Sequence, residues 1–571
     1  MTNAHSPVWV FPPAADSAAV ARIQGTWKIP RTMAEIMWRR LGPRLTDDQV
    51  ETFLHPHFRD LHDPYLYAGM RRAAQRLAEA VQNREPVALY GDYDVDGTTA
   101  IALLVEALQT LGIQVEWRIP HRTTDGYGLS DRGVQLLREC PGSLVIVLDC
   151  GVTAVEQIAT LTGEGREVIV VDHHEPGPRL PDALAVLDAK RSDGGYPFDG
   201  LSAVGVAFKL LQALGDVLGL PPGALLLPGL DLVAVGTAAD IVPVRDENRV
   251  LMRYGLRRLK RNPRPGLRAL LNVSGLTGRR LTTSSIVFGI APRINAAGRM
   301  GSADAAVRLL LSRDQKEALS LAMELNRINR QRQMMDQQVL DTARAEAEKQ
   351  IAQGARALVL ADPDWHPGII GIVAARLVEE FYLPTVMIAV REPVGRGSGR
   401  SIEGFDLHSA LGECADTLVG YGGHVRAAGL SIMPDRVPAF RERFQQVAAQ
   451  CLTDDLLYPR IHLDAEVRLH EVNLGLVAAL EKLGPFGPEN MRPVLVSRGA
   501  RAIADPIILK GVHLKAEVEQ EGAVRQIIAF NHAWAAPMFD GPVDIAYVAE
   551  EDIWRGSSRL QLRVKAIRPA K

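Results

Sequence analysis

The stretch Pro86-Val-Ala-Leu-Tyr90, followed at once by Gly91-Asp-Tyr-Asp-Val-Asp-Gly97, decides the fold of the first half of the chain. Its short apolar run recurs as Leu144-Val-Ile-Val-Leu148 and as Glu167-Val-Ile-Val-Val171, with helix-like stretches between the runs. Continuous β-branched runs of this kind are typical of buried parallel strands joined by helical crossovers. The sequence therefore predicts an α/β domain with a parallel sheet.

Each of these three strands ends in a carboxylate. The first is followed by Asp92, Asp94 and Asp96, the second by Asp149, and the third by Asp172-His173-His174. Ligands of open parallel sheets bind outside the carboxyl ends of the strands, so we expect these side chains to converge. A further acid, Asp240, ends the apolar stretch from residue 231 to residue 239.

Several carboxylates at one point repel each other unless some are protonated or divalent cations lie among them. Carboxylate oxygens and imidazole nitrogens, with no thiolate, suit Mn²⁺ or Mg²⁺ better than structural zinc. Two such ions roughly 3.5–4 Å apart can hold the attacking and leaving oxygens of a phosphoryl displacement. The pattern thus favours phosphoester hydrolysis.

Two alternative interpretations of the acidic residues carry less weight. The Asp-x-Asp-x-Asp-Gly spacing imitates a calcium EF-hand loop, but its twelfth position is Leu103 where Glu is required, and a strand precedes it instead of a helix. A single Asp after a strand is more often a helix cap or a turn residue than a ligand. The metal hypothesis depends on all of these residues following strands of one sheet.

Four segments in order, Gly91–Ala100, Asp149–Gly151, Asp172–His174 and Gly236–Pro243, resemble the four motifs of the DHH phosphoesterase superfamily. Further stretches resemble its branch of single-strand-specific 5′→3′ DNA exonucleases: Tyr196-Pro with Gly205–Leu210, Ala291–Arg299, Gly397–Asp406 and Gly422–His424. The likeness covers residues from about 60 to 500. It departs from the usual pattern at Leu187-Asp-Ala-Lys190, where many relatives have Asn-Pro.

Residues 1–60 carry few motifs and are interpreted as an N-terminal capping segment. For the rest of the chain the resemblance implies four parts, and the periodicity of the chain agrees with them. They are a DHH catalytic domain (61–303), a strongly helical connection (304–353), a DHH-associated α/β domain (354–455) and a β-rich, OB-fold-like domain (456–571). It also implies 5′→3′ degradation of single-stranded DNA to mononucleotides, in DNA repair and recombination. Implied partners are single-stranded DNA, a single-stranded-DNA-binding protein and a RecQ-like helicase.

Residue roles follow from the same resemblance. The implied ligands of two Mn²⁺ or Mg²⁺ ions are Asp92, Asp94, Asp96, Asp149, His173 and Asp240, with Asp149 as a bridging candidate. His174 is expected near the scissile phosphate, and Asp172 is expected to orient a histidine. Arg122, Ser398 and Arg400 resemble the family's pocket for a 5′-phosphate. From their own sequence surroundings, the further candidates for contacts to DNA are Arg293, Asn295, Arg299, Arg376 and His424. We expect Arg293, Asn295 and Arg299 in a Gly/Ala-rich loop, and Ser398 and Arg400 in a glycine-rich turn.

The formal net charge of −2 excludes only a uniformly basic protein, because the charges are unevenly distributed. Residues 248–303 contain no Asp or Glu but hold 12 Lys or Arg residues. Such a bias fits a surface that contacts phosphates, although some of these side chains are expected to pair with acids from elsewhere. Aromatic residues form only 5% of the chain, so base stacking should be limited to a few positions.

Length and composition set wider limits. The 571 residues, 47% of them apolar, are enough for several buried cores. Four cysteines without a CxxC pair favour a reducing compartment, and we expect a cytoplasmic monomer without a membrane segment. Two alternatives stay open: a DHH phosphoesterase for short RNA or cyclic dinucleotides, and a non-catalytic DHH-fold scaffold of a repair assembly.

Overall fold

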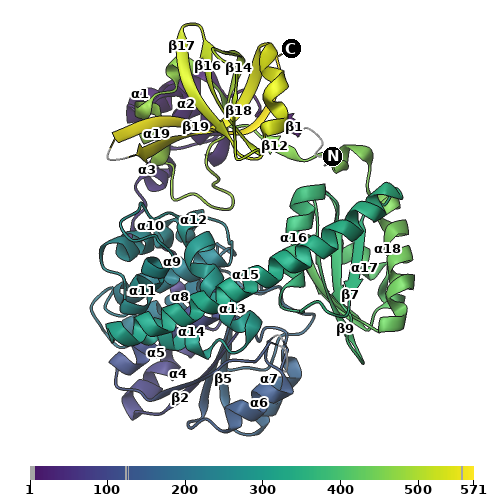
Figure 1. Ribbon diagram of the computed structural model, residues 1–571. Coiled ribbons are helices and arrows are strands. Elements are labelled where there is room, and N and C mark those ends of the chain that lie inside the picture. Colours follow the sequence, from purple (N-terminus) through teal and green to yellow (C-terminus); the bar gives the residue numbers. More distant parts are fainter. Residues whose placement is uncertain (1–6, 123–124, 127, 555–556, 571) are drawn as a thin grey trace. The chain divides into compact units, whose positions relative to one another are not determined.

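The computed structural model describes residues 7–122, 125–126, 128–554 and 557–570. The chain divides into two compact units. The central unit contains residues 55–334 and 485–491, and the flanking unit contains the remaining described residues. Figure 1 labels the helices and strands of both units.

A five-stranded, entirely parallel sheet forms the framework of the central unit, which confirms the predicted parallel α/β domain. Its strands are β2 (Val87–Gly91), β3 (Val115–Arg118), β4 (Leu144–Leu148), β5 (Glu167–Val171) and β6 (Ala185–Leu187), in the order β3-β2-β4-β5-β6. The helices α5 (Val95–Thr110), α6 (Asp131–Arg138) and α7 (Val155–Gly163) connect strands of this sheet, whereas α4 (Met70–Asn83) precedes β2 and α8 (Ala203–Val217) follows β6. The predicted strands 144–148 and 167–171 have the bounds of β4 and β5.

The register of the sheet brings four strand ends into one row. Gly91 is paired with Leu148, Leu148 with Val171, and Val171 with Leu187. Each of these four residues is followed in the sequence by an aspartate. Because neighbouring strands lie about 4.8 Å apart, the row places Asp92, Asp149, Asp172 and Asp188 along one edge.

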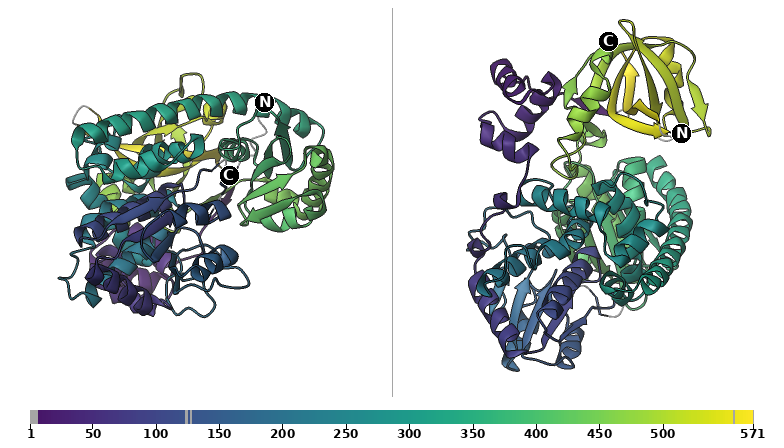
Figure 2. Two further views of the ribbon diagram at one scale, coloured as in Figure 1. Left: turned by 90° about the horizontal axis from the view of Figure 1, so that it is seen from below. Right: turned by 90° about the vertical axis from the view of Figure 1, so that its left-hand side faces the viewer.

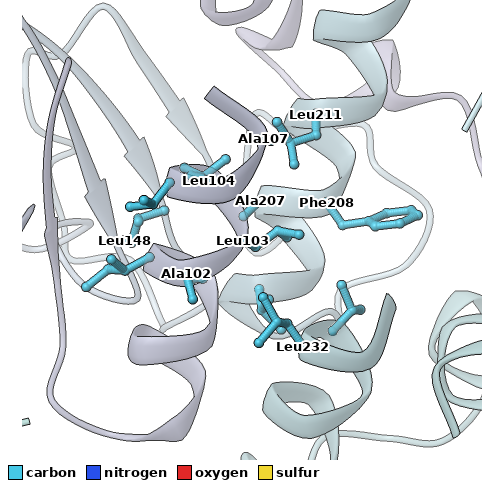
Figure 3. Packing of buried hydrophobic residues seen from close by; sticks show 14 of the residues in the cluster. Ala102, Leu103, Leu104, Ala107, Leu148, Ala207, Phe208, Leu211 and Leu232 are labelled. Carbon is cyan, nitrogen blue, oxygen red and sulfur yellow. The ribbon is translucent and has the colours of Figure 1, made fainter. Parts of the chain in front are cut away.

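The core of the central unit lies where α5 packs against α8 and against α9 (Leu230–Ala239). Leu103, Phe208 and Leu232 are at most 1% exposed and belong to the buried cluster that these helices share (Figure 3). Removing a buried side chain as large as Phe208 typically costs about 3–5 kcal/mol. This packing fixes the helices that carry Asp96 and precede Asp240.

The predicted loop around residues 291–299 is instead a helix, so that expectation was wrong. Helix α13 spans Ala291–Met300 and continues directly from a π-helical turn, η4 (Ile286–Ile290). Pro292 is the second residue of α13, directly after the π-helical turn, and the alanines of the segment favour the helix. The other helices of this region are α10 (Asp246–Arg261), α11 (Pro265–Val273), α12 (Thr283–Ser285) and α14 (Asp304–Leu311).

The helical connection predicted over residues 304–353 is two helices, α14 and the long α15 (Gln315–Ala352), seen in teal in Figure 1. Ser312 has an extended backbone that ends α14. Asp314 then accepts hydrogen bonds from the backbone N–H groups of Lys316 and Glu317 and starts α15. A capping residue thus restarts the helix without any Pro or Gly.

The flanking unit contains another sheet, with both parallel and antiparallel strand pairs, in the order β10-β11-β9-β8-β7. Its elements are β7 (Leu358–Asp362), α16 (Ile370–Phe381), β8 (Thr385–Ala389), β9 (Gly395–Arg400), α17 (Leu407–Gly412), β10 (Gly420–Gly423), β11 (Ala427–Ile432) and α18 (Val437–Cys451). The glycine-rich turn expected at 395–400 is therefore a strand. Its glycines relieve contacts, because a Cβ at Gly397 would lie 2.6 Å from Leu430, and one at Gly399 would lie 2.9 Å from Leu407.

The C-terminal part of the flanking unit is a five-stranded barrel, which confirms the predicted β-rich, OB-fold-like domain. Its strands are β14 (Leu495–Ala502), β16 (His513–Gln520), β17 (Ala523–Ala529), β18 (Val543–Trp554) and β19 (Ser557–Pro569), closed by pairing of β14 with β16. The yellow strands curve round into this barrel in the right-hand view of Figure 2. Smaller elements at its edges are β12 (Arg460–His462), β13 (Ala465–Glu466), β15 (Ile507–Leu509) and α19 (Leu474–Glu481).

The N-terminal segment attaches to this barrel region. It forms β1 (Val8–Val10), α1 (Ser17–Trp27), α2 (Arg31–Leu41) and α3 (Asp47–Leu54). Strand β1 pairs in parallel with β12, and Trp9 is buried with Leu463 and Val496. Among the described residues, no helix is both long and apolar enough to cross a bilayer.

Candidate metal centre

The turn after β2 presents three aspartates in different ways. Asp94 caps α5, accepting hydrogen bonds from the backbone N–H groups of Asp96 (2.8 Å) and Gly97 (3.2 Å). Gly97 has to lack a side chain, since a Cβ there would clash with the carbonyl oxygen of Asp92. The tight turn keeps the Asp92 carboxylate buried, 2% exposed, at the strand end.

Asp96 links this turn to the start of α8. Its two carboxylate oxygens accept hydrogen bonds from the backbone N–H groups of Ala203 (2.5 Å) and Val204 (3.0 Å). A negative charge at this position is stabilised by the N-terminal end of the helix. Asp96 therefore positions α8 and at the same time lies inside the acidic cluster.

Asp149 follows β4 with a left-handed backbone, at φ 60°, which is uncommon for a residue other than glycine. Its backbone N–H donates to the carbonyl of Val171 at the end of β5 (2.9 Å). Its carboxylate is 3% exposed. Backbone strain of this kind concentrates at functional sites, where the surrounding structure holds it in place.

Asp172 is surrounded by donors and orients a histidine. It accepts hydrogen bonds from His174 Nδ1 (2.7 Å), from the backbone N–H of His173 (2.8 Å) and from that of Val152 (2.9 Å). Burial acts to raise the pKa of Asp172, but the hydrogen bond and charge of His174 outweigh it and bring that pKa to about 2. Burial lowers the pKa of His174, yet its bond to Asp172 leaves that pKa above the usual value.

Asp240 approaches the same point from a helix rather than from a strand. It ends α9, where the helix dipole is negative and disfavours a carboxylate. Gly236, one turn earlier, allows the helix to come close, because a Cβ there would lie 2.9 Å from Asp96 Oδ1 and would clash with Thr99 Oγ1. The position of Asp240 thus calls for a compensating positive charge.

The side chain of His173 is the meeting point of the cluster. Its Nε2 lies 3.3 Å from Asp149 Oδ1, 3.5 Å from Asp240 Oδ2 and 3.9 Å from Asp96 Oδ2. Three groups of residues have potential ligand atoms within 4.8 Å of one another: Asp149, His173 and His174; Asp96, His173 and Asp240; Asp92, Asp94 and Asp149. All seven residues form what we call the strand-end cluster.

The carboxylates of the cluster repel one another when no cation is bound. Burial, followed by repulsion from other aspartates, raises the pKa values of Asp92, Asp149 and Asp240 well above the ordinary value and that of Asp96 to about 7. Among the described residues, the buried Oδ1 of Asp92 accepts no hydrogen bond. Hard oxygen donors, an imidazole and uncompensated negative charge fit Mn²⁺ or Mg²⁺.

Two predicted arginines approach the cluster through Tyr93. The guanidinium of Arg122 lies over the Tyr93 ring, 5.1 Å from its centre, and its charge acts on the nearby Asp92. Gly298 packs against Tyr93, where a Cβ would lie 2.6 Å from the carbonyl oxygen, and the charge of the next residue, Arg299, acts on Tyr93. Thr123, Thr124 and Tyr127, which belong to the motif around Arg122, lie outside the described residues.

Helix α13 distributes the other two predicted residues over different faces. Asn295 lies one turn before Arg299 and shares its face. Arg293 is directed instead toward α15, where its Nε donates to Asn326 Oδ1 (3.0 Å) and its Nη1 donates to the carbonyl of Gly289. Arg293 thus ties α15 to the π-helical turn.

Within the acid-free window, several cations have structural partners. Arg264 is 9% exposed and binds Asp231 and Glu106, and Arg258 lies 3.7 Å from Asp231. Arg249 is 3% exposed. The cations of the window that are exposed are Arg253, Arg257, Lys260, Arg261, Arg268, Arg279 and Arg280.

The remaining predicted residues belong to the flanking unit. On β9, Arg400 donates to Ser398 Oγ (3.1 Å), and Gly371 near the start of α16 lies against both, since a Cβ there would meet Ser398 Oγ at 2.7 Å. Arg376 on α16 donates to Gln337 of α15 (3.2 Å). His424 is exposed, and its backbone N–H donates to the carbonyl of Ala427.

One residue of the row of strand ends escaped the sequence reasoning. Asp188, after β6, is 2% exposed, and among the described residues its Oδ2 accepts no hydrogen bond. Burial raises its pKa to about 7. The sequence does contain an acid directly after an apolar residue here, Leu187-Asp188, in the segment that departs from the family's usual pattern. Because β6 has only three residues, its apolar run was too short to predict a strand before Asp188.

Comparisons with known proteins show similarity over several parts of the chain. Three family models match it: the DHH family, N-terminal domain (residues 86–237), the DHHA1 domain (354–450) and the RecJ OB domain (463–566). The single-stranded-DNA-specific exonuclease RecJ of Bacillus subtilis is 37% identical over 525 residues, 91% of this chain and 66% of the relative, so the chain spans about two thirds of that protein. RecJ of Dickeya dadantii is 34% identical over 95% of this chain and 97% of the relative.

Solved structures show the same likeness. The crystal structure of RecJ in complex with Mn²⁺ from Thermus thermophilus matches with a TM-score of 0.86 at 32% identity, covering 99% of this chain and 80% of that chain. The corresponding complex with Mg²⁺ matches with a TM-score of 0.80 at 30% identity, covering 99% of this chain and 79% of that chain.

Proposed function

Because the chain belongs to the RecJ family of single-stranded-DNA-specific exonucleases, we propose that it hydrolyses single-stranded DNA to mononucleotides from the 5′ end, with two Mn²⁺ or Mg²⁺ ions. This membership confirms the DHH superfamily that the four motifs predict. The activity serves DNA repair and recombination.

The observation that carries the proposal is the convergence of the strand-end cluster. The carboxylates of Asp149 after β4, of Asp96 in the first turn of α5 and of Asp240 at the end of α9 lie within 3.9 Å of Nε2 of His173. Burial and mutual repulsion disfavour their ionisation. We assign Asp92, Asp94, Asp96, Asp149, His173 and Asp240 as the residues that hold the cations. When bound, the cations would polarise a phosphodiester and lower the pKa of the attacking water.

The protein's own groups hold the substrate and the protons. Asp172 stays ionised near neutral pH and holds the His174 ring through Nδ1, and the same bond favours the protonated imidazole. We assign His174 the role of donating a hydrogen bond to an oxygen of the scissile phosphate, where negative charge develops during the displacement. Asp172 is its positioning residue.

Selection of the 5′ end is assigned to donors outside the cluster. In the central unit, Arg122 lies over Tyr93 and offers a guanidinium suited to a terminal phosphate. In the flanking unit, Ser398 and Arg400 beside the start of α16 offer donors of the same kind. Arg293, Asn295, Arg299, Arg376 and His424 are assigned to contacts with the strand. Contacts to phosphates do not read the identity of the bases directly, so we expect cleavage to be independent of DNA sequence.

End-labelled single strands of 20 nucleotides test the proposal. With Mn²⁺, a 5′ label should be released as a mononucleotide at once, whereas a 3′ label should appear in mononucleotides only at the end of the digestion. Blunt duplex of the same sequence should be spared. Equal release from both ends, or equal attack on the duplex, would contradict the assigned polarity or strand preference.

A second test separates this activity from the alternatives. A linear 20-mer and a cyclic dinucleotide compete for the same enzyme, and the 20-mer should be consumed first. Preference for the dinucleotide would instead support a phosphoesterase for small substrates. Failure to hydrolyse either substrate, with metal binding also absent, would support the scaffold alternative.

Location and protein partners are further proposals. The chain's four cysteines are all free, and three of them are buried, which supports a reducing cytoplasm. The family resemblance supports a single-stranded-DNA-binding protein and a RecQ-like helicase as partners. Co-purification from a cytoplasmic fraction, with and without nuclease treatment, would separate direct partners from those held by DNA.

A further inference from the structure

Phe288 is an aromatic side chain that the fold leaves in solvent. It is 79% exposed, whereas its neighbours Ile286 and Ile290 in the same turn are fully buried. The turn is the π-helix η4, which continues into α13. Single π-helical turns occur frequently at functional sites. Folding gains nothing from Phe288, so its exposure calls for another explanation.

The surroundings of Phe288 are cationic. Leu276 packs against the next residue, Gly289, where a Cβ would lie 2.5 Å from Leu276 Cδ1, and this contact places the turn that contains Arg279 beside η4. Arg279 and Arg280 are exposed. Arg293, in the helix that follows η4, donates to the carbonyl of Gly289, the residue next to Phe288. All of these residues lie in the window without Asp or Glu.

We propose that Phe288 is a stacking platform for one base of the single strand, with Arg279, Arg280 and Arg293 contacting the adjacent phosphates. An exposed ring among cations matches a polyanion whose units each carry a flat aromatic face, and single-stranded DNA has this chemistry. An apolar protein surface would fit the ring but not the cations. The inference rests on the proposed function and adds a base contact to it.

The distance from the metal centre follows from the continuous helical run. Gly298 packs against Tyr93, the neighbour of Asp92 in the sequence. Phe288 lies ten residues before Gly298 in the same helical run, which corresponds to about 15 Å along the helix axis. At about 3.4 Å per stacked nucleotide, this corresponds to roughly four nucleotides. The base that stacks on Phe288 is therefore several positions from the scissile phosphate, and a dinucleotide cannot reach it.

The test uses the full chain and the variant Phe288→Ala, with Leu227→Ala as a matched control, because Leu227 is a 49% exposed side chain elsewhere in the central unit. Binding of 5′-phosphorylated dT20 is measured in chelator, so hydrolysis is not needed. We expect Phe288→Ala to weaken binding about five- to a hundred-fold. Phe288→Trp should restore it, and Leu227→Ala should leave it unchanged.

Two further comparisons distinguish stacking from a general loss of charge or structure. An abasic 20-mer should bind wild type and Phe288→Ala equally, and the slope of log affinity against log salt should be unchanged in Phe288→Ala. Arg279→Ala with Arg280→Ala should instead reduce that slope, by up to about 0.7 for each lost contact. In Mn²⁺, the KM of Phe288→Ala should rise for the 20-mer but not for 5′-phosphorylated dTdT.

Equal dT20 affinities for wild type and Phe288→Ala would overturn the proposal, and so would an equal penalty on the abasic strand. Absence of hydrolysis by the wild type would contradict the proposed nuclease activity, but the binding measurements in chelator would still decide the role of Phe288.

Discussion

Two buried clusters of charge in the central unit differ in how their charge is compensated. In the strand-end cluster, aspartates gather around His173, and their pKa values are raised. In the second cluster, which we call the Lys209 network, Lys209 and Glu247 are both fully buried and lie 2.9 Å apart. The Lys209 Nζ also donates to the carbonyl of His62, and Tyr196 donates to Glu247.

The difference separates charge buried for stability from charge buried for chemistry. The Lys209 network is complete within the chain, because every charge faces an opposite charge or a hydrogen-bond partner, and it joins α8 to α10 and to the segment before α4. The strand-end cluster has more negative than positive charge, so only a ligand can complete it. Removing one group should therefore destabilise the Lys209 network, whereas removing one carboxylate should relieve repulsion in the strand-end cluster.

The largest effect is expected for Asp149→Asn. Hydrolysis should fall about 10³-fold or more, because the cation site loses a central oxygen donor. Stability in chelator should be unchanged or higher, because a repelled carboxylate has been removed. Nuclease assays and urea unfolding measure the two effects. Retained turnover would contradict the metal assignment, and a strong loss of stability would contradict the comparison of the two clusters.

Lys209→Met should do the reverse. Leaving Glu247 buried without its partner should cost about 3–5 kcal/mol of unfolding free energy. Activity per folded molecule should change little below the unfolding temperature. The double variant Lys209→Met with Glu247→Gln should recover part of the loss. Lys260→Met, on the exposed face of α10, serves as the control and should stay within about 0.5 kcal/mol of wild type.

Metal addition should stabilise only proteins with an intact strand-end cluster. At a concentration of Mn²⁺ about 100 times Kd, the unfolding free energy should rise by about 2.7 kcal/mol. Asp149→Asn should lose this gain, whereas Lys209→Met should keep it relative to its own lower baseline. A gain of equal size in wild type and Asp149→Asn would place the bound ion elsewhere.

The smallest effect concerns pH. The pKa values of Asp96 and Asp188 are raised to about 7 in the metal-free folded protein, against about 3.9 when unfolded. The folded state therefore binds more protons between about pH 4 and pH 7, and stability in chelator should fall as pH rises through this window, by about 1 kcal/mol or more. In Mn²⁺ the trend should weaken or reverse. Calorimetry in chelator at about pH 5 and pH 7 checks the direction of this change. A higher Tm at pH 7 than at pH 5 would contradict it.

The sequence predicted best where one local pattern had only one stable outcome. The runs at 144–148 and 167–171 are continuous and β-branched, and they became β4 and β5 with the predicted bounds. Because Asp149 and Asp172 directly follow these strands, predicting the strands also predicted their positions at the strand ends. The same reasoning failed for Ala291–Arg299, where small residues were interpreted as a loop although alanine also favours a helix.

Glycine caused a similar error at residues 395–400. Glycines are frequent in turns, but in β9 they make room for Leu430 and Leu407, which lie far away in the sequence. The break at Ser312 between α14 and α15 was also missed, because it depends on capping by Asp314 rather than on a helix-breaking residue. In each case a contact, not a propensity, selected the conformation.

The sequence by itself determined that this chain has a parallel sheet with acids at its strand ends, because hydrophobic periodicity and strand-end composition are local properties. Only the tertiary structure decided which acids meet. The pairing register aligned Asp188 with Asp92, Asp149 and Asp172, and the packing of α9 on α5 brought Asp240 to His173. Register and helix packing depend on contacts between distant residues, which no local pattern specifies.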